Sequence, residues 1–274
     1  MNAFNNAPIG IFDSGVGGLT VVREVMRQMP RERIVYFGDT ARVPYGSKSQ
    51  STIIRYSRQD IAFLQSCGVK AIVVACNTAS AMALPHIQQD YELPILGVVE
   101  RGARLAAQRT RNGRVGIIGT RATVQSGLHR RIIEEIDPAI VTVSKACPLF
   151  VPLVEECLFH DVVTEEIARR YLQVMKDDDV DTLILGCTHY PFLRSTIRRV
   201  MGEGVDLINP AYETALELRG MLESQGLTCG QDVDAAGEKY QFFVSDGADA
   251  FRQFAASALE MDIPSAAEIN IEDY

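Results

Sequence analysis

Short apolar runs alternate with longer amphipathic segments along most of the chain. The apolar runs are rich in Ile, Val, Leu and Phe and are bounded by polar or glycine-containing stretches, a pattern typical of strands buried on both faces. This pattern predicts strands at Ile9–Phe12, Ile34–Phe37, Ala71–Val74, Ile95–Val98, Val115–Ile118, Ile140–Val143, Thr182–Leu185 and Val205–Ile208.

The amphipathic segments between these runs predict helices. In Ser49–Cys67 the apolar residues share one helical face, and Gly68 supplies the stop. Thr164–Lys176 predicts a helix that begins with Thr164 as its cap, and Tyr212–Ser224 is a further amphipathic segment. Strands and helices that alternate at this spacing indicate an α/β fold with mainly parallel sheets flanked by helices.

The two halves of the sequence resemble each other weakly. "IGIFDSG" (9–15) matches "VGIIGTR" (115–121), and "VVACNT" (73–78) matches "LILGCT" (183–188). We therefore expect two pseudo-symmetric α/β domains with an active site in the cleft between them. The first would comprise residues 1–99 plus 208–274, with the C-terminal segment packing back on it, and the second residues 100–207. The acidic tail "AAEINIEDY" has little to bury and is expected to be loose.

Composition narrows the class of function. The 274 residues are 47% hydrophobic, which suffices for a sizeable core, and carry a net charge of −8. That charge argues against a nucleic-acid partner but leaves a small anionic substrate open. The N-terminus shows no signal-peptide pattern and no apolar run approaches the ~20 residues of a membrane helix, so we expect a cytoplasmic protein without a membrane partner.

The cysteines give the first indication of chemistry. All six lack CxxC spacing, which disfavours a disulfide framework or a zinc ribbon. Cys76 and Cys187 each end a predicted strand and precede a Thr and a segment that can begin a helix. Ligands bind beyond the carboxyl ends of parallel strands, and a helix N-terminus lowers the pKa of a thiol. Two thiols on opposite sides of one crevice would suit inversion at a carbon, one removing a proton and the other supplying one.

Further polar groups suit the same crevice. Asp13 ends the first strand and could lie beside Cys76, where it would orient groups, since its charge raises a neighbouring thiol's pKa. His189 is two residues from Cys187 and could hold or shuttle its proton. Hydroxyl and amide groups that could bind a carboxylate are those of Ser14, Asn77, Thr78, Thr120 and Thr188.

Simpler interpretations compete with each of these. A buried cysteine usually serves packing alone, and Asp13 with Ser14 could merely cap the following helix. Gly15–Gly18 is neither a dinucleotide fingerprint nor a phosphate loop, because Thr20 stands at the third glycine position and no lysine follows. Cys187 with His189 lacks a second ligand pair, so no metal site is predicted.

At these residues the sequence closely resembles the glutamate racemases of the cofactor-independent aspartate/glutamate racemase superfamily. The matching stretches are "IGIFDSGVGGLTV" (9–21), "YFGDTARVPYGSKS" (36–49), "VVACNTASA" (73–81), "IGTRATV" (118–124), "CPLFVPLVE" (147–155) and "LGCTHYP" (185–191).

The resemblance implies interconversion of L- and D-glutamate by two catalytic cysteines, Cys76 toward D-glutamate and Cys187 toward L-glutamate. It implies assisting roles for Asp13, His189 and Glu155. It also implies that neither pyridoxal phosphate nor a metal is needed, that D-glutamate is supplied for peptidoglycan, and that the protein can form a homodimer. The substrate-contacting positions that it implies are Ser14, Tyr45, Gly46, Asn77, Thr78, Thr120, Thr123 and Thr188.

Three rival functions remain open at this point. The first is an aspartate racemase of the same superfamily, because the pocket details that set side-chain length cannot be read from the sequence. The second is a two-lobed amino-acid binding protein with inert thiols. The third is a thiol redox protein, although Cys76 and Cys187 lack the spacing that makes disulfide exchange fast.

Overall fold

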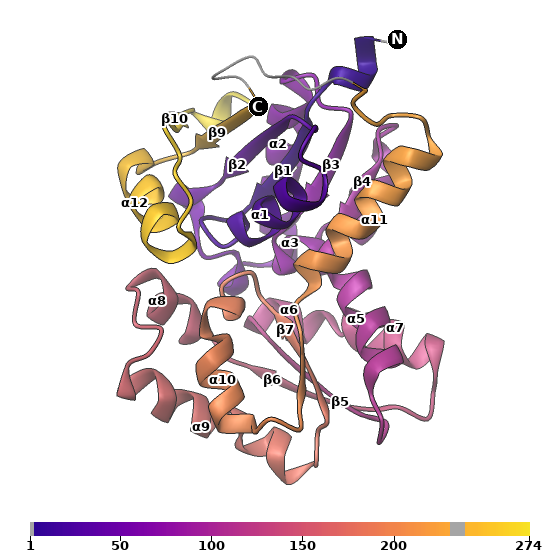
Figure 1. Ribbon diagram of the computed structural model, residues 1–274, viewed down its shortest axis with the longest axis vertical. Helices are drawn as coiled ribbons and strands as arrows, with labels where there is room; N and C mark the ends of the chain where they lie inside the picture. Colours follow the sequence, from indigo (N-terminus) through magenta and orange to yellow (C-terminus); the bar gives the residue numbers. More distant parts are fainter. Residues whose placement is uncertain (1–2, 231–238) are drawn as a thin grey trace.

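The chain folds around two sheets, which lie one above the other in the computed structural model shown in Figure 1. The structure describes residues 3–230 and 239–274. The first sheet has the order β10-β9-β2-β1-β3-β4 and the second β6-β5-β7-β8. Within the described residues every strand pairing is parallel. The strands are β1 (Ile9–Asp13), β2 (Ile34–Gly38), β3 (Ala71–Val74), β4 (Ile95–Gly97), β5 (Arg114–Gly119), β6 (Val141–Ala146), β7 (Thr182–Gly186), β8 (Asp206–Ile208), β9 (Tyr240–Val244) and β10 (Ala267–Glu268).

Helices connect the strands and cover both sheets (Figure 1). The α-helices are α1 (Leu19–Gln28), α2 (Gln50–Ser66), α3 (Asn77–Met82), α4 (Leu84–Ile87), α5 (Val98–Arg109), α6 (Arg121–Ser126), α7 (Leu128–Ile136), α8 (Phe150–Glu155), α9 (Val162–Asp177), α10 (Arg194–Met201), α11 (Pro210–Ser224) and α12 (Ala248–Leu259). Short 3-10 helices are η1 (Ala3–Asn6), η2 (Thr40–Arg42), η3 (Tyr45–Ser47), η4 (Gln88–Asp90), η5 (Tyr190–Leu193) and η6 (Ile271–Asp273). None of the helices described is long and apolar enough to cross a membrane.

The continuous apolar runs arise because each sheet is packed on both faces. In β1, Ile9 and Ile11 join the cluster beneath α1, α11 and α12, whereas Phe12 joins the cluster beneath α2. In β5, Ile117 faces α5 and α7, and Ile118 faces α8, α9 and α10. Successive side chains of a strand point to opposite faces, so a strand with helices on both sides is apolar at every position.

The eight predicted strands are all confirmed, with ends that differ by a few residues. Gly68 follows α2 with a φ of +69°, as its predicted role as helix stop requires. The predicted cap of α9 is wrong. The helix begins earlier, and Asp161 accepts the Val163 N–H at 2.7 Å, while the Thr164 hydroxyl donates to the Leu158 carbonyl.

The expectation of a loose tail is also wrong. Within the last residues β10 pairs with β9, and the buried Ile271 of η6 packs in the cluster beneath α2. β9 in turn pairs with β2, which extends the first sheet by two strands that were not predicted. Ile269 packs against the same cluster, and the Tyr274 ring lies edge-on to Phe63 of α2, so the segment has apolar surface to bury.

The chain passes between the sheets twice, once through α5 and once through α11. On this basis we propose the division into domains predicted from the sequence, residues 1–99 with 208–274 and residues 100–207. Limited proteolysis would test it: cleavage near residues 99 and 207 should give three fragments, of which 1–99 and 208–274 stay associated and separate from 100–207.

A buried ion pair joins the first sheet to the segments that flank it. The Lys70 side chain is fully buried, and its Nζ lies 2.5 Å from Glu32 Oε2. Nζ also donates to the carbonyls of Asn5 and Leu227, and the second carboxylate oxygen of Glu32 accepts the Cys229 N–H. With these partners the two charges have most of their hydrogen-bonding capacity satisfied inside the protein.

Candidate active site

A small cavity lies beyond the carboxyl ends of the strands of both sheets, and both strand-end cysteines line it. Its volume is about 20 Å³, room for about one water molecule. A cavity of this size does not admit an amino acid, so binding requires lining residues to move apart. The lining residues are Ser14, Val43, Pro44, Tyr45, Gly46, Cys76, Asn77, Thr78, Thr120, Val151, Cys187, Thr188 and His189.

Cys76 lies two residues after the end of β3 and caps α3. Its Sγ accepts the Ala79 N–H at 3.5 Å and lies 3.7 Å from the Ser14 hydroxyl, to which it can donate. Burial, followed by the nearby charge of Asp13, raises the pKa of the Cys76 thiol to about 12. The expectation that a helix start lowers the pKa is wrong here, because one N–H contact does not offset burial and a neighbouring carboxylate. Cys76 is thus a protonated thiol at neutral pH.

Cys187 follows β7 and lies beside His189. Its Sγ is 3.8 Å from His189 Nδ1, and on the other side of the ring Nε2 lies 3.3 Å from Glu155 Oε1. Burial opposes protonation of the imidazole, but the contacts with Cys187, Glu155 and Asp13 together raise the pKa of His189 to about 10. Cys187 leads into a turn and η5 rather than into an α-helix, so its charged neighbour is a histidine and not a helix end.

Asp13 ends β1 and is fully buried behind the cavity. Its Oδ2 accepts the N–H groups of Gly15 and Gly18 at 3.1 and 3.0 Å, and its Oδ1 accepts the Thr188 hydroxyl at 3.3 Å. Burial raises the pKa of Asp13 against the opposing effects of His189 and these donors. The carboxyl group thus holds the loop after β1 and a threonine of the other sheet in one arrangement.

Three threonines join the two halves of the site. Thr78, at the start of α3, lies 3.0 Å from Thr120 and 3.2 Å from Thr123 between hydroxyl oxygens, and Thr120 lies 2.9 Å from Thr123. Thr120 caps α6 and lines the cavity, whereas Thr123 supports it from behind. Asn77 also lines the cavity, and its buried Oδ1 has no hydrogen-bond partner among the described residues. This oxygen is a ready acceptor for an ammonium group.

Two glycines allow close approach across the site. A Cβ at Gly17 would lie 2.3 Å from Thr188 Oγ1 and 2.7 Å from His189 Nδ1. A Cβ at Gly46 would lie 2.4 Å from the Cβ of Thr120. Both contacts join a loop beyond the first sheet to a residue beyond the second, so any side chain at either position would push the two halves apart.

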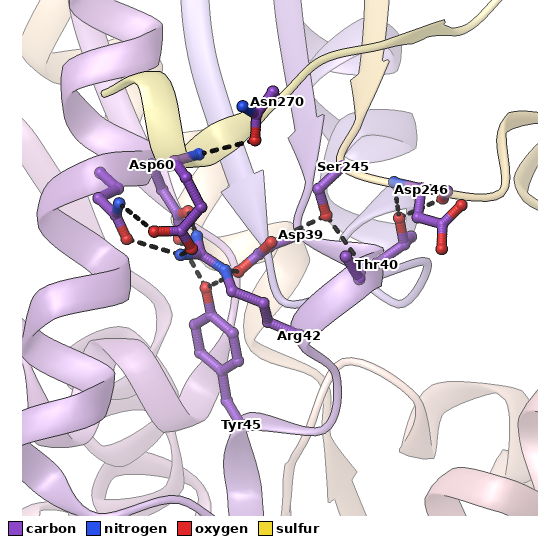
Figure 2. A network of polar contacts seen from close by, with 11 residues as sticks. Asp39, Thr40, Arg42, Tyr45, Asp60, Ser245, Asp246 and Asn270 are labelled. Atoms are coloured by element: carbon purple, nitrogen blue, oxygen red, sulfur yellow. Dashed lines mark hydrogen bonds and ion pairs between the residues drawn. The ribbon is translucent and has the colours of Figure 1, made fainter.

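The site residues expected from the sequence come together around the cavity. Ten of them line the cavity, and Asp13, Glu155 and Thr123 support it from behind. Tyr45 differs from expectation in one respect. Its hydroxyl contacts Asp39 and Asp60, as Figure 2 shows, and neither of these carboxyl groups lines the cavity. Tyr45 can therefore meet a ligand through its backbone and ring, not through its hydroxyl.

The sequence analysis did not identify several residues that line the cavity or lie next to its lining. Val43, Pro44 and Val151 line the cavity, and the Val43–Pro44 peptide bond is cis. Asp39 and Arg42 lie within the stretch 36–49 that matched the racemase motif, and this match could have drawn attention to them. Among the residues that the structure describes, no group of three or more His, Cys, Asp or Glu side chains is arranged to bind a metal ion.

Known proteins share both the sequence and the fold. The family model described as Asp/Glu/Hydantoin racemase matches residues 10–218. A glutamate racemase of Geobacter metallireducens is 48% identical over 240 residues, 87% of each chain. The crystal structure of glutamate racemase isoform RacE1 from Bacillus anthracis superimposes with a TM-score of 0.90 at 38% identity, covering 97% of this chain and 98% of that one. The structure of glutamate racemase from Francisella tularensis in complex with D-glutamate gives a TM-score of 0.90 at 35% identity and covers 98% and 100%.

Proposed function

The chain belongs to the Asp/Glu/hydantoin racemase family, and on this premise we propose that it interconverts L- and D-glutamate by moving the α-proton between Cys76 and Cys187. It is an isomerase, and its substrate is glutamate. The observation that carries the assignment of the two bases is that both thiols line one cavity, each from the end of a different sheet.

Toward L-glutamate, Cys187 removes the α-proton and Cys76 supplies a proton to the opposite face. The raised pKa of Cys76, about 12, supports this order, because the group that supplies the proton must begin as a thiol. His189, whose pKa of about 10 leaves it protonated at neutral pH, faces Cys187 and stabilises negative charge on that sulfur. In the reverse direction the roles exchange, and Cys76 is the base toward D-glutamate.

The remaining residues orient the substrate and stabilise the carbanion formed at the α-carbon. Ser14 and the hydroxyls of Thr78, Thr120 and Thr188 are donors for the substrate carboxylates, and Asn77 Oδ1 is an acceptor for its ammonium group. Asp13, Glu155 and Thr123 act on residues that line the cavity. Donors fixed in a dry site stabilise developing charge more strongly than water does.

Incubation with L-glutamate in deuterium oxide, without added cofactor, tests this function. We expect optical rotation to disappear while deuterium enters the α-carbon. Cys76→Ala and Cys187→Ala should each abolish racemisation in a folded protein. Each variant should still eliminate hydrogen halide from one enantiomer of a β-halogenated analogue, since elimination needs one base. Equal processing of both enantiomers by both variants would contradict the two-sided arrangement.

The finer features are proposals as well. We propose that the D-glutamate supplies peptidoglycan synthesis in the cytoplasm and that the protein forms a homodimer, which light scattering of the native protein would test. Aspartate is the competing substrate. A higher kcat/KM for aspartate than for glutamate would replace the assignment with an aspartate racemase.

A further inference from the structure

A group of buried charges lies directly behind the segment 43–46 that lines the active site. Asp39 and Asp60 are fully buried, and the Arg42 side chain between them is 9% exposed. Arg42 Nε lies 2.6 Å from Asp39 Oδ2, and its Nη2 lies 3.2 Å from Asp60 Oδ1. The guanidinium also stacks on the Tyr56 ring, 4.0 Å from its centroid. Two buried carboxyl groups thus share one buried cation (Figure 2).

The hydrogen bonds of Tyr45 constrain where the protons in this group lie. The Tyr45 hydroxyl oxygen is 2.5 Å from Asp39 Oδ2 and 2.9 Å from Asp60 Oδ2. A tyrosine hydroxyl carries one hydrogen, and an ionised carboxylate only accepts. With both carboxylates ionised, one of the two contacts would place two lone pairs against each other. Both contacts become hydrogen bonds if one carboxyl group keeps a proton and donates it to the Tyr45 oxygen.

Asp60 is the carboxyl group better suited to keep that proton. Asp39 receives the shorter contact from Arg42, together with a hydrogen bond from the Ser245 hydroxyl at 2.9 Å to its other oxygen. A charged donor on one oxygen and a hydroxyl donor on the other stabilise the ionised form of a carboxyl group. Burial and the charge of Asp39 raise the pKa of Asp60 well above its usual value, and burial with both carboxyl groups raises that of Tyr45. Neutral Asp60 leaves one anion and one cation, so the buried charges cancel.

We propose that Asp39, Arg42, Tyr45 and Asp60 are positioning residues for racemisation, in which Asp60 carries a proton and donates it to Tyr45 while Tyr45 donates to ionised Asp39. This inference rests on the proposed function. Arg42 and Tyr45 stand on either side of Val43 and Pro44, and both side chains insert into the group. The backbone between them is thereby fixed at both ends, with Gly46 seated against Thr120.

The C-terminal part of the chain completes the arrangement. Ser245 Oγ accepts the Ala41 N–H at 2.8 Å, and the Asp246 N–H donates to the Thr40 hydroxyl at 3.0 Å. The half-exposed Glu272 reaches Arg42 Nη1 at 3.3 Å. These contacts secure the segment that precedes the loop, so that displacement of Arg42 or Tyr45 is transmitted to residues 43–46 and not absorbed upstream.

Paired substitutions at Asp60 test the proposal. Asn matches the protonated acid in shape, and it can donate through Nδ2 to Tyr45 and accept from Arg42 through Oδ1. We expect Asp60→Asn to keep kcat/KM within about threefold of wild type. Asp60→Ala should lower it on the order of 10²-fold, the usual effect of misplacing a site by about 1 Å. Equal loss in both variants would show that Asp60 acts ionised, and unchanged activity in Asp60→Ala would show that the group positions nothing; either result overturns the proposal.

The proton can also be located without measuring activity. In protein labelled with carboxyl-¹³C aspartate, the signal absent from Asp60→Asn should have the chemical shift of a neutral carboxylic acid at neutral pH. A carboxylate shift overturns the proposal even if Asp60→Ala fails to fold. Failure of the proposed function is a separate result, in which wild-type protein does not exchange the α-hydrogen of glutamate in deuterium oxide.

Discussion

Replacement of Gly17 by Ala tests whether the two halves of the active site must meet as closely as the structure indicates. The added methyl carbon would lie 2.3 Å from Thr188 Oγ1, 2.7 Å from His189 Nδ1 and 2.9 Å from the Thr188 Cβ. Non-bonded heavy atoms are comfortable at about 3.5–4.0 Å, so a shift of about 1 Å is required. Rotation of the Thr188 hydroxyl alone does not relieve three contacts, and it would break the hydrogen bond to Asp13.

A displacement of this size should lower kcat/KM for both enantiomers on the order of 10²-fold, about 2.7 kcal/mol of transition-state stabilisation. Gly15→Ala is the matched control in the same loop. Its methyl carbon would meet only the Val43 side chain, at 3.5 Å from Cγ2 and 4.0 Å from Cβ, and Gly15 does not have a positive φ. We expect this variant to keep near wild-type activity and stability.

Polarimetry with L- and D-glutamate measures the rates, and thermal unfolding followed by circular dichroism checks that both variants fold. Overpacking should cost Gly17→Ala about 1–3 kcal/mol of stability. If folded Gly17→Ala retains more than about half of the wild-type kcat/KM, or if Gly15→Ala is equally impaired, the close approach of the two loops does not matter for catalysis.

Three further outcomes are expected. Lys70→Met should lower the free energy of unfolding in urea by about 3–5 kcal/mol, because it leaves Glu32 buried without its cation. Recovery of stability on adding Glu32→Gln would support this cause. A decrease below about 1 kcal/mol in Lys70→Met would contradict it. The pKa of His189 is about 10 when folded and about 6.5 when unfolded, so the folded state binds more protons between these values and stability should fall as pH rises from about 6.5 to 9. His189→Gln should flatten that slope, and an unchanged slope would refute the assignment. Gly68→Ala, at a φ of +69° with open space around it, should cost about 1 kcal/mol of stability without changing kcat/KM.

The strand pattern was readable because helices cover both faces of both sheets. A run such as Val115–Ile118 has no polar alternative face, so burial alone identifies it. β9, with the sequence YQFFV, lies beyond the last recognised motif and pairs with β2 far away in the sequence. β9 joins the first sheet through tertiary contacts, and local hydrophobic periodicity carries no information about such contacts. The cap of α9 was misplaced because Asp161 and Thr164 are both good caps and the helix starts with exposed valines.

The candidate site was predictable where residues end strands. Cys76, Cys187 and Asp13 each follow or end a strand, and parallel strands place such positions at the carboxyl edge of their own sheet. The protonation of the site was not predictable. A helix start suggested a lowered pKa for Cys76, but burial and Asp13 dominate, and both are properties of the folded state. Asp60 gave no signal either, because a carboxylate within an amphipathic helix is expected to face solvent.

The contacts of Ser245 and Asp246 with the segment that precedes the active-site loop also bear on the order of events during synthesis. The residues that secure Thr40 and Ala41 are 204 to 206 positions further along the chain. Both cysteines are translated well before them, so a ribosome-bound nascent chain can contain the two proposed catalytic cysteines while the loop still lacks the contacts with Ser245 and Asp246. Competence for turnover should then arise late, when β9 docks on β2, and not when Cys187 leaves the ribosome.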